Sequence, residues 1–342
     1  MENKRIIWLD LAKGFAMLLV VIGHCMRDEM RQASMILDLF YRSIYIFHMA
    51  FFFWLSGNIY MLSKSKNDQP LAIAKRRIQK QFPPWIFYTL FIYIVFEIAM
   101  RLPILKDLFA RSGYSSLSII EYLLSCFKAN NPLAYHLWFL YILMIIILLF
   151  SILDNYTIHV CPIAIASGFI GILARDIVPV RSWWRLYNYV TLYLPMFAIG
   201  AWQCNFQPKK KILYPWGFIG LAYIAIRAVY YSDFSGNSLR VEGLERCIIY
   251  ILSYLCLPGL MLLLKHVFQQ EIFPPTKRYL TFLGKNSLAI YLYHQPFCCA
   301  FPGMILYNRL HFNAILTMSI CFVLCMLIGL FQEFLAKRKQ HD

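Results

Sequence analysis

Charged side chains are scarce in this sequence. They make up 15% of its 342 residues, whereas soluble domains carry about a quarter. Hydrophobic residues account for 60% of the chain, and its mean hydropathy is +0.57. This composition excludes an ordinary soluble globular protein. It predicts that most of the chain lies in lipid, with room for roughly ten membrane-crossing helices.

Metal-binding and disulfide patterns are missing as well. The ten cysteines show no Cys-x-x-Cys motif and no mixed Cys/His spacing of the kind that binds zinc. Most of them lie inside apolar runs, where cysteine behaves as a small hydrophobic residue. We therefore expect neither a disulfide framework nor a bound metal.

The N-terminus lacks the features of a cleaved signal peptide, although Lys4 and Arg5 precede an apolar run. Asp10 and Lys13 interrupt that run, and no small-residue cleavage site follows it. We therefore predict that the first apolar run remains in the protein as a membrane span.

Acidic residues are few: 17 Asp and Glu stand against 33 Lys and Arg, which gives a net charge of +16. A strongly basic chain can bind nucleic acid. Here, however, the basic residues cluster between apolar runs and do not form one patch with interleaved aromatic residues. We therefore expect the lipid bilayer, and no nucleic acid, as the partner of these cations.

Long apolar runs are the dominant feature that is present. Ten can be placed as transmembrane helices of about 20 residues each. The predicted spans are 6–26, 39–62, 84–103, 134–153, 158–174, 188–204, 212–231, 245–267, 284–307 and 312–336. The shorter segment 115–127 is predicted to be an interfacial or re-entrant helix. The predicted fold is all-α, a polytopic membrane bundle in which residues 1–342 form one domain.

Basic residues are distributed unevenly between the predicted loops. They concentrate in every second loop and in the C-terminal tail, at 64–80, 209–211, 265–278 and 337–339. The cytoplasmic loops of membrane proteins carry such an excess of Lys and Arg. We therefore predict that both termini lie in the cytoplasm.

The first predicted span carries three ionisable residues, Asp10, Lys13 and His24. Inserting such a group into a bilayer costs roughly 2.5–3.5 kcal/mol, so each requires an explanation. On a helix, the step from Lys13 to His24 turns through about 1100°, which leaves about 20° between their directions. Asp10 lies one turn before Lys13 on the same side. The span thus projects a carboxylate, an ammonium and an imidazole along one face.

The order of these residues along the helix predicts separate roles for Lys13 and His24. They are roughly 16 Å apart, with Lys13 toward the cytoplasmic side and His24 toward the outer side. A histidine can act as a general base near neutral pH on a hydroxyl group that attacks an acyl group. The alternative is a histidine that hydrogen-bonds a neighbouring helix or reaches the membrane interface.

A cluster of cations precedes Pro83-Pro84 and the predicted third span. It includes Arg76, Arg77 and Lys80. Arg77 and Lys80 are one helical turn apart and would present two cations on one face just inside the membrane. Such a pair suits a phosphate-bearing ligand or anionic lipid head groups.

Six residues near other span ends are candidates for a substrate pocket. They are His48, Ser56, Trp138, Asn286, Tyr291 and His294. Each also has a structural interpretation. A serine beside glycine permits close helix packing, an interfacial tryptophan belongs to an aromatic belt, and the other side chains can hydrogen-bond between helices or reach the interface.

Taken together, these segments resemble the membrane-bound acyltransferase-3 family. The resemblance rests on five segments in family order, namely Trp8–Gly14 with Gly23-His24, Phe52–Gly57, Arg77–Pro83, His136–Leu140 and Gly284–His294. The opening LDLAKG…GH, and Phe47-His48-Met49 before the aromatic run, make the chain look closest to the fucose 4-O-acetylase-like branch.

The resemblance implies ten transmembrane helices and the transfer of an acyl group to a carbohydrate on the far side of a bacterial plasma (inner) membrane. The usual donor in the family is acetyl-CoA. The family's catalytic histidine corresponds to His24, and its basic partner to Lys13. Its paired arginines, which are associated with the CoA moiety, correspond to Arg77 and Lys80. Lysine at the second position lacks the bidentate guanidinium fork.

These expectations combine into one mechanistic hypothesis. Arg77 and Lys80 hold the CoA phosphates, the pantetheine arm passes Lys13, and His24 deprotonates a sugar hydroxyl. Lys13, oriented by Asp10, stabilises developing charge. A covalent acyl-histidine is an alternative to the general base, and an exporter of polysaccharide or lipid-linked sugar is an alternative to the enzyme. The sequence predicts neither the identity of the acceptor nor a partner protein.

Overall fold

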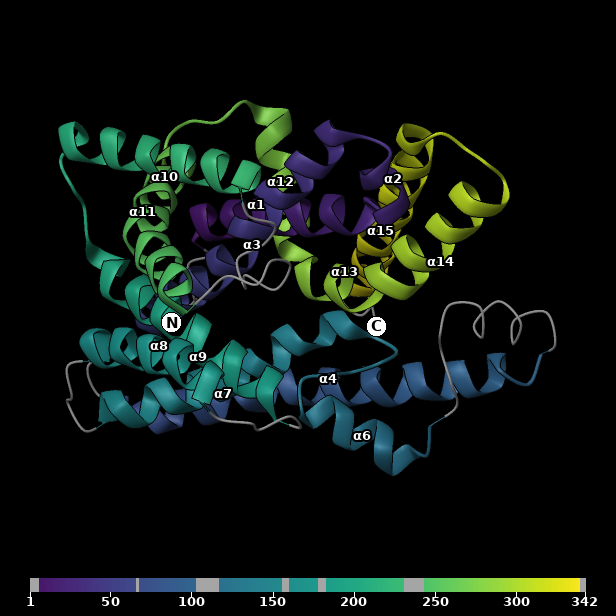
Figure 1. The fold of residues 1–342 in the computed structure, drawn as a ribbon, viewed down its shortest axis with the longest axis horizontal. Coiled ribbons are helices and arrows are strands. Elements are labelled where there is room, and N and C mark those ends of the chain that lie inside the picture. Colours follow the sequence, from purple (N-terminus) through teal and green to yellow (C-terminus); the bar gives the residue numbers. More distant parts are fainter. Residues whose placement is uncertain are drawn as a thin grey trace. The chain divides into compact units, whose positions relative to one another are not determined.

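The computed structural model describes residues 6–65, 68–102, 117–155, 160–177, 183–230 and 243–338. Within these ranges the regular elements are helices, and no strand is found. The predicted all-α fold is therefore confirmed (Figure 1). The chain divides into two compact units, one formed by residues 1–59 with 199–342 and the other by residues 60–198.

The first unit is organised around its N-terminal helix. Its α-helices are α1 (Ile7–Cys25), α2 (Asp28–Gln32), most of α3 (Met35–Leu62), α10 (Lys210–Tyr230), α11 (Gly243–Gln269), α12 (Pro274–Lys285), α13 (Ser287–Tyr293), α14 (Phe301–Gly303) and α15 (Ala314–Arg338). Short turns are η2 (Gln203–Asn205), η3 (His294–Ala300) and η4 (Met304–Arg309), of which the last two are π-helical. Helix α1 packs against α11, α12 and α15, and α10 packs along α11 (Figure 1).

Two glycines bring α1 and α12 into close contact. A Cβ atom added to Gly14 would lie 1.9 Å from the carbonyl oxygen of Leu280, and one added to Gly284 would lie 2.0 Å from that of Asp10. Helices in a membrane approach this closely where glycine lies at their contact. The Gly284 of the resemblance therefore has a packing role, which fixes the axis of the helix that carries His24.

The second unit contains α4 (Pro70–Ala99), α6 (Ile119–Phe127), η1 (Tyr135–Leu137), α7 (Trp138–Asn155), α8 (Val160–Ile177) and most of α9 (Trp184–Trp202). Helices α4 and α7 lie side by side. Between them the buried Trp85 ring stacks on Tyr141, with centroids 5.1 Å apart.

The predicted short helix within 115–127 is confirmed as α6. Ser118 begins it with a capping box, in which the Ser118 Oγ accepts a hydrogen bond from Glu121 N and the Glu121 carboxylate accepts one from Ser118 N. The Ser118 hydroxyl also donates to Glu121 Oε2 at 2.7 Å, and this bond, together with the one from Ser118 N, lowers the pKa of the exposed Glu121. The Tyr122 hydroxyl donates to the carbonyl oxygen of Thr89 at 3.0 Å and ties α6 to α4. A place for α6 at the membrane interface stays a prediction.

Seven helices among the described residues are long and apolar enough to cross a membrane. They are Ile7–Cys25, Met35–Leu62, Pro70–Ala99, Tyr135–Asn155, Lys210–Tyr230, Cys247–Gln269 and Ala314–Arg338. Each overlaps a predicted span. The described parts of the other three predicted spans are helical but interrupted, shorter or more polar, and these spans stay predictions. The span 158–174, whose first two residues lie outside the described ranges, includes the shorter apolar helix Pro162–Gly171. The span 188–204 falls mainly on α9, and 284–307 falls on α12 to η4.

Two predicted boundaries are wrong. The third span was predicted to begin at Pro84, whereas α4 begins at Pro70 and contains both Pro83 and Pro84. A proline inside a transmembrane helix is tolerated because neighbouring groups satisfy the carbonyl that it leaves free. The ninth span was expected to start at Gly284, but the backbone breaks at Asn286 and a new helix begins at Ser287.

Candidate active site

His24 lies at the point where three parts of the first unit meet. It is the next-to-last residue of α1 and is partly exposed. Its Nδ1 is 2.7 Å from Gln295 Nε2 on η3 and 3.3 Å from the Tyr45 hydroxyl on α3. The His294 ring lies 5.0 Å from the His24 ring between centroids. Gln295 and Tyr45 were not among the residues selected from the sequence.

The glycine before His24 makes room for Tyr45. A Cβ atom added to Gly23 would lie 3.1 Å from Tyr45 Cε2, which is tighter than ordinary contact. The Tyr41 ring stacks on that of Tyr45, with centroids 4.0 Å apart. The Arg31 guanidinium in turn lies 3.7 Å from the centroid of the Tyr41 ring. Packing against Tyr45 thus explains the glycine of the Gly23-His24 pair.

The orientation of the Gln295 amide determines which nitrogen of His24 holds the lone pair. The amide nitrogen faces His24 Nδ1, and an amide NH₂ group only donates, so Nδ1 accepts and the neutral ring carries its proton on Nε2. Rotating the Gln295 side-chain amide by about 180° would exchange its nitrogen and oxygen and place the oxygen beside His24 Nδ1. That oxygen could accept the Nδ1–H bond, and Nε2 would then hold the lone pair. The amide can therefore support either tautomer.

His294 and His48 are fixed by their own helices. His294 Nδ1 donates to the carbonyl oxygens of Tyr291 at 2.7 Å and Ile290 at 3.2 Å, and His48 Nδ1 donates to that of Ile44 at 2.8 Å. In the neutral rings the lone pair therefore lies on Nε2. Both side chains are buried. His294 thus adds a second imidazole of defined tautomer beside His24.

The π-helical turn η3 explains why His294 and Gln295 reach His24. A π turn widens the helix by one residue, and such turns occur frequently at functional sites. Pro296 lies within the turn and contributes no backbone N–H. The pattern of apolar residues does not predict a π-helical turn. The sequence therefore indicated His294, which is ionisable, but not the neutral Gln295 beside it.

A charged network fastens the segment from η3 to η4 to the start of α2. Asn308 Nδ2 and Arg27 Nη2 each donate to Glu29 Oε1 at 3.0 Å, and Arg27 Nη1 donates to the Ala300 carbonyl oxygen at 3.3 Å. Burial acts to raise the pKa of Glu29, but the hydrogen bonds from Asn308 and Arg27 outweigh it and leave that pKa below its ordinary value. The network supports the element that carries Gln295.

Asp10 and Lys13 lie on α1 as the helical stripe predicted. Asp10 is buried, and its carbonyl oxygen meets Gly284, while Lys13 is partly exposed. The rise of a helix separates Lys13 from His24 by roughly 16 Å, so the two do not act on one atom. A role for Lys13 and Asp10 in the reaction stays a prediction.

Three other predicted pocket residues have structural contacts. The Ser56 hydroxyl donates to the Phe52 carbonyl oxygen at 2.8 Å, one turn back on its own helix. The Asn286 amide donates to Glu333 on α15 at 3.1 Å. Tyr291 is buried, with its ring 6.1 Å from that of His294. Of the three, Tyr291 lies beside an imidazole of the site.

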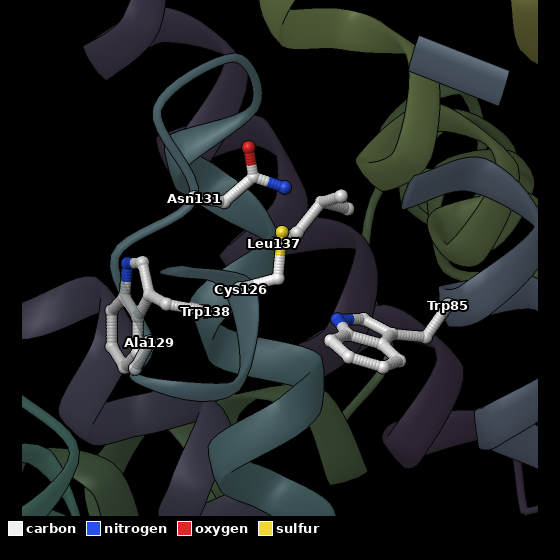
Figure 2. Close-up of a pocket in the computed structure, with 6 residues that line it drawn as sticks. All are labelled: Trp85, Cys126, Ala129, Asn131, Leu137 and Trp138. Atoms are coloured by element: carbon white, nitrogen blue, oxygen red, sulfur yellow. The ribbon is translucent and has the colours of Figure 1, made fainter. Parts of the chain in front are cut away.

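Trp138 belongs to the second unit. It stacks on Tyr189 of α9, with centroids 4.2 Å apart. It also lines a narrow pocket, shown in Figure 2, together with Trp85, Cys126, Ala129, Asn131 and Leu137. The space between these side chains is too tight to hold a sugar ring.

The predicted phosphate-binding cations lie in the first turns of α4, also in the second unit. Arg77 Nη2 donates to Ser63 Oγ at 2.8 Å, and Lys80 is exposed. Arg76 pairs with Asp68 at 3.0 Å. A backbone hydrogen bond from Ser65 and the Arg76 guanidinium lower the pKa of Asp68. Arg76 is thereby partly neutralised, whereas no acidic partner of Lys80 is found in the described part of the chain.

Comparison with known proteins gives a single kind of match. The sequence model of an acyltransferase domain, of the acyltransferase 3 type, matches residues 6–331. No curated protein and no solved structure matches the chain. The matched region includes His24, His294 and Gln295. It covers the first six of the seven long apolar helices completely and all but the end of the last, Ala314–Arg338. The chain belongs to the acyltransferase 3 family and is a multi-pass membrane acyltransferase.

Proposed function

We propose that this enzyme transfers an acetyl group from acetyl-CoA to a hydroxyl of a cell-surface or lipid-linked carbohydrate, and that His24 is the reacting histidine. The observation that carries the proposal is the contact of 2.7 Å between His24 Nδ1 and Gln295, next to His294. A histidine that only packed at a helix end would not need a second imidazole and an orienting amide beside it.

In the proposed reaction the sugar oxygen attacks the thioester carbonyl carbon. The Gln295 amide is turned so that its oxygen accepts the Nδ1–H bond, and His24 Nε2 then holds the lone pair that takes the hydroxyl proton. The C–O bond forms and the C–S bond breaks, and the proton passes from His24 to the departing CoA thiolate. The products are an acetyl ester and free CoA. His294, Tyr291 and His48 are proposed to line the acceptor side of this centre.

Donor binding is proposed to involve a different group of residues. Arg77 and Lys80 present cations suited to the phosphates of CoA, and Arg76 contributes less because Asp68 pairs with it. Lys13, near the start of α1, is proposed to attract the anionic donor, with Asp10 orienting it. The support for these roles is the order of the residues in the family segments.

The proposed setting is a bacterial plasma membrane with both termini in the cytoplasm. The distribution of basic residues supports this orientation. His24 then faces the outer side, where the carbohydrate acceptor is available. We propose that the whole chain acts as one catalytic domain.

The proposal is tested by a His24→Ala variant with His266→Ala as a matched control. His266 is a histidine near the end of α11, with its ring 6.3 Å from that of Tyr214 and outside the His24 cluster. Base-labile acetate on the cell's envelope carbohydrates is measured. We expect His24→Ala to abolish it and His266→Ala to leave it unchanged. Equal acetylation in all strains, with normal amounts of protein in the membrane, would overturn the assignment of His24.

A further inference from the structure

Five buried cysteines cluster beside the proposed active site. Cys25 directly follows His24 on α1, Cys298 and Cys299 lie in η3, and Cys321 and Cys325 lie on α15. Each is at most 4% exposed and carries a free thiol. Taken singly, each is a small hydrophobic residue of an apolar run. Together they gather nucleophilic groups from three elements at one place.

The geometry of the cluster centres on Cys299. Its Sγ lies 3.6 Å from Cys25 Sγ and 3.7 Å from Cys325 Sγ. A disulfide bond is about 2.05 Å long, so either pair needs to close by about 1.5 Å to become bonded. The two possible bonds differ in what they join. Cys25–Cys299 would connect α1 to η3, whereas Cys299–Cys325 would connect η3 to α15.

We propose that Cys25 and Cys299 form a redox-modification site, in which oxidation by a peroxide produces a disulfide that displaces His24 relative to Gln295 and stops acyl transfer. The loss of activity, though not the bond itself, rests on the function proposed above. Cys25 is adjacent to His24 in the chain, and Cys299 is four residues after Gln295 in the same π-helical turn. A bond between the two cysteines therefore acts directly on both partners of the catalytic contact.

The chemistry is a two-electron oxidation in two steps. The peroxide oxidises one thiol to a sulfenic acid, with its O–O bond broken and one water released. The second thiol then attacks the sulfenic sulfur, the S–S bond forms, and a second water leaves. Hydrogen peroxide is the fitting oxidant because burial of both thiols excludes a protein oxidant and admits a small neutral molecule.

The expected effect on activity follows from the distance that must close. The two sulfur atoms must approach by about 1.5 Å, and the part of this approach that side-chain rotation does not supply is shared between α1 and η3. A misplacement of about 1 Å in a catalytic contact can reduce a rate roughly hundredfold. A Cys299–Cys325 bond would leave the end of α1 free. It should therefore have a smaller effect on turnover.

The experiment uses the purified full chain in lipid vesicles, treated with hydrogen peroxide and then with a thiol-alkylating reagent. Peptide mass spectrometry identifies the linked cysteines, and acetyl transfer is assayed before oxidation, after it, and after dithiothreitol. The same series is run on Cys25→Ala and on Cys325→Ala as the matched control. Thermal unfolding confirms that each variant is folded.

We expect a Cys25–Cys299 crosslink and a roughly hundredfold, thiol-reversible loss of turnover in the wild type and in Cys325→Ala. Cys25→Ala should keep its activity under peroxide. A missing crosslink, a crosslink to Cys325 alone, or equal inactivation of Cys25→Ala would overturn the proposal. A Cys25–Cys299 crosslink in a protein that transfers no acetyl group before oxidation would contradict the proposed function, while supporting the modification site.

Discussion

Replacing Gln295 by leucine tests whether the amide orients His24 for catalysis. The substitution removes the hydrogen-bonding amide 2.7 Å from His24 Nδ1 and puts an apolar side chain of similar size in its place. Breaking such a bond and leaving a polar atom unsatisfied costs about 1–3 kcal/mol. Since about 1.4 kcal/mol corresponds to a factor of ten in rate, kcat should fall about 5- to 150-fold.

Two companion variants make this prediction specific. In Gln295→Glu the carboxylate can accept the Nδ1–H bond, so its kcat should stay above that of Gln295→Leu. Tyr45→Phe removes a hydroxyl that lies 3.3 Å from the same nitrogen and retains the ring packed on Gly23 and Tyr41. Because this contact is longer, the loss should be smaller than that of Gln295→Leu.

The assay is steady-state acetyl transfer by purified protein in lipid, with kcat and KM determined separately. An orienting role predicts that kcat falls while KM for the donor is unchanged. The reasoning is refuted if Gln295→Leu, folded as judged by thermal unfolding, retains the wild-type kcat while His24→Ala is inactive. It is equally refuted if Tyr45→Phe loses more activity than Gln295→Leu.

Three further variants test the packing, the charged network and the donor site. Gly284→Ala should lower the free energy of unfolding by about 1–3 kcal/mol in a denaturation experiment, because its Cβ would lie 2.0 Å from a backbone oxygen. Gly303→Ala, whose Cβ would lie no nearer than 3.2 Å to any of its neighbours, the nearest being the Arg27 side chain, should change it less, and an equal loss would contradict the helix-contact argument. The lowered pKa of Glu29 gives stability that is present above the ordinary value of 4.5 and is lost as the pH falls through the folded-state pKa. The melting-temperature difference between wild type and Glu29→Gln should therefore shrink below about pH 4.5, and a difference independent of pH would count against the bond to Asn308. Arg77→Ala should raise KM for acetyl-CoA and spare kcat, so a fall in kcat alone would exclude a role in donor binding.

The sequence was sufficient to place the helix that carries the candidate site. Its apolar periodicity defined α1, and the cost of burying Asp10, Lys13 and His24 singled them out. The same reasoning found His294, because a histidine in an apolar run is conspicuous. Seven of the ten predicted spans overlap long apolar helices among the described residues.

Features that depend on tertiary contacts could not be predicted in this way. Gln295 is neutral and was therefore not conspicuous, and it reaches His24 only because η3 adopts a π turn around Pro296. In the sequence, Tyr45 is one of many aromatic residues in its span, and its position beside His24 depends on the packing of its ring against Gly23. The cysteines are far apart in sequence, so the contact between Cys25 and Cys299 follows from the packing of α1 on η3 alone.

The central claim is most directly tested by following the acetyl group itself. Purified protein in lipid vesicles is given acetyl-CoA that is isotopically labelled in its acetyl group, together with envelope carbohydrate from cells that lack the enzyme. We predict labelled, base-labile acetate on the carbohydrate with wild-type protein and His266→Ala, and none with His24→Ala. Labelled carbohydrate formed equally by His24→Ala, or none formed by correctly folded wild-type protein, would contradict the account.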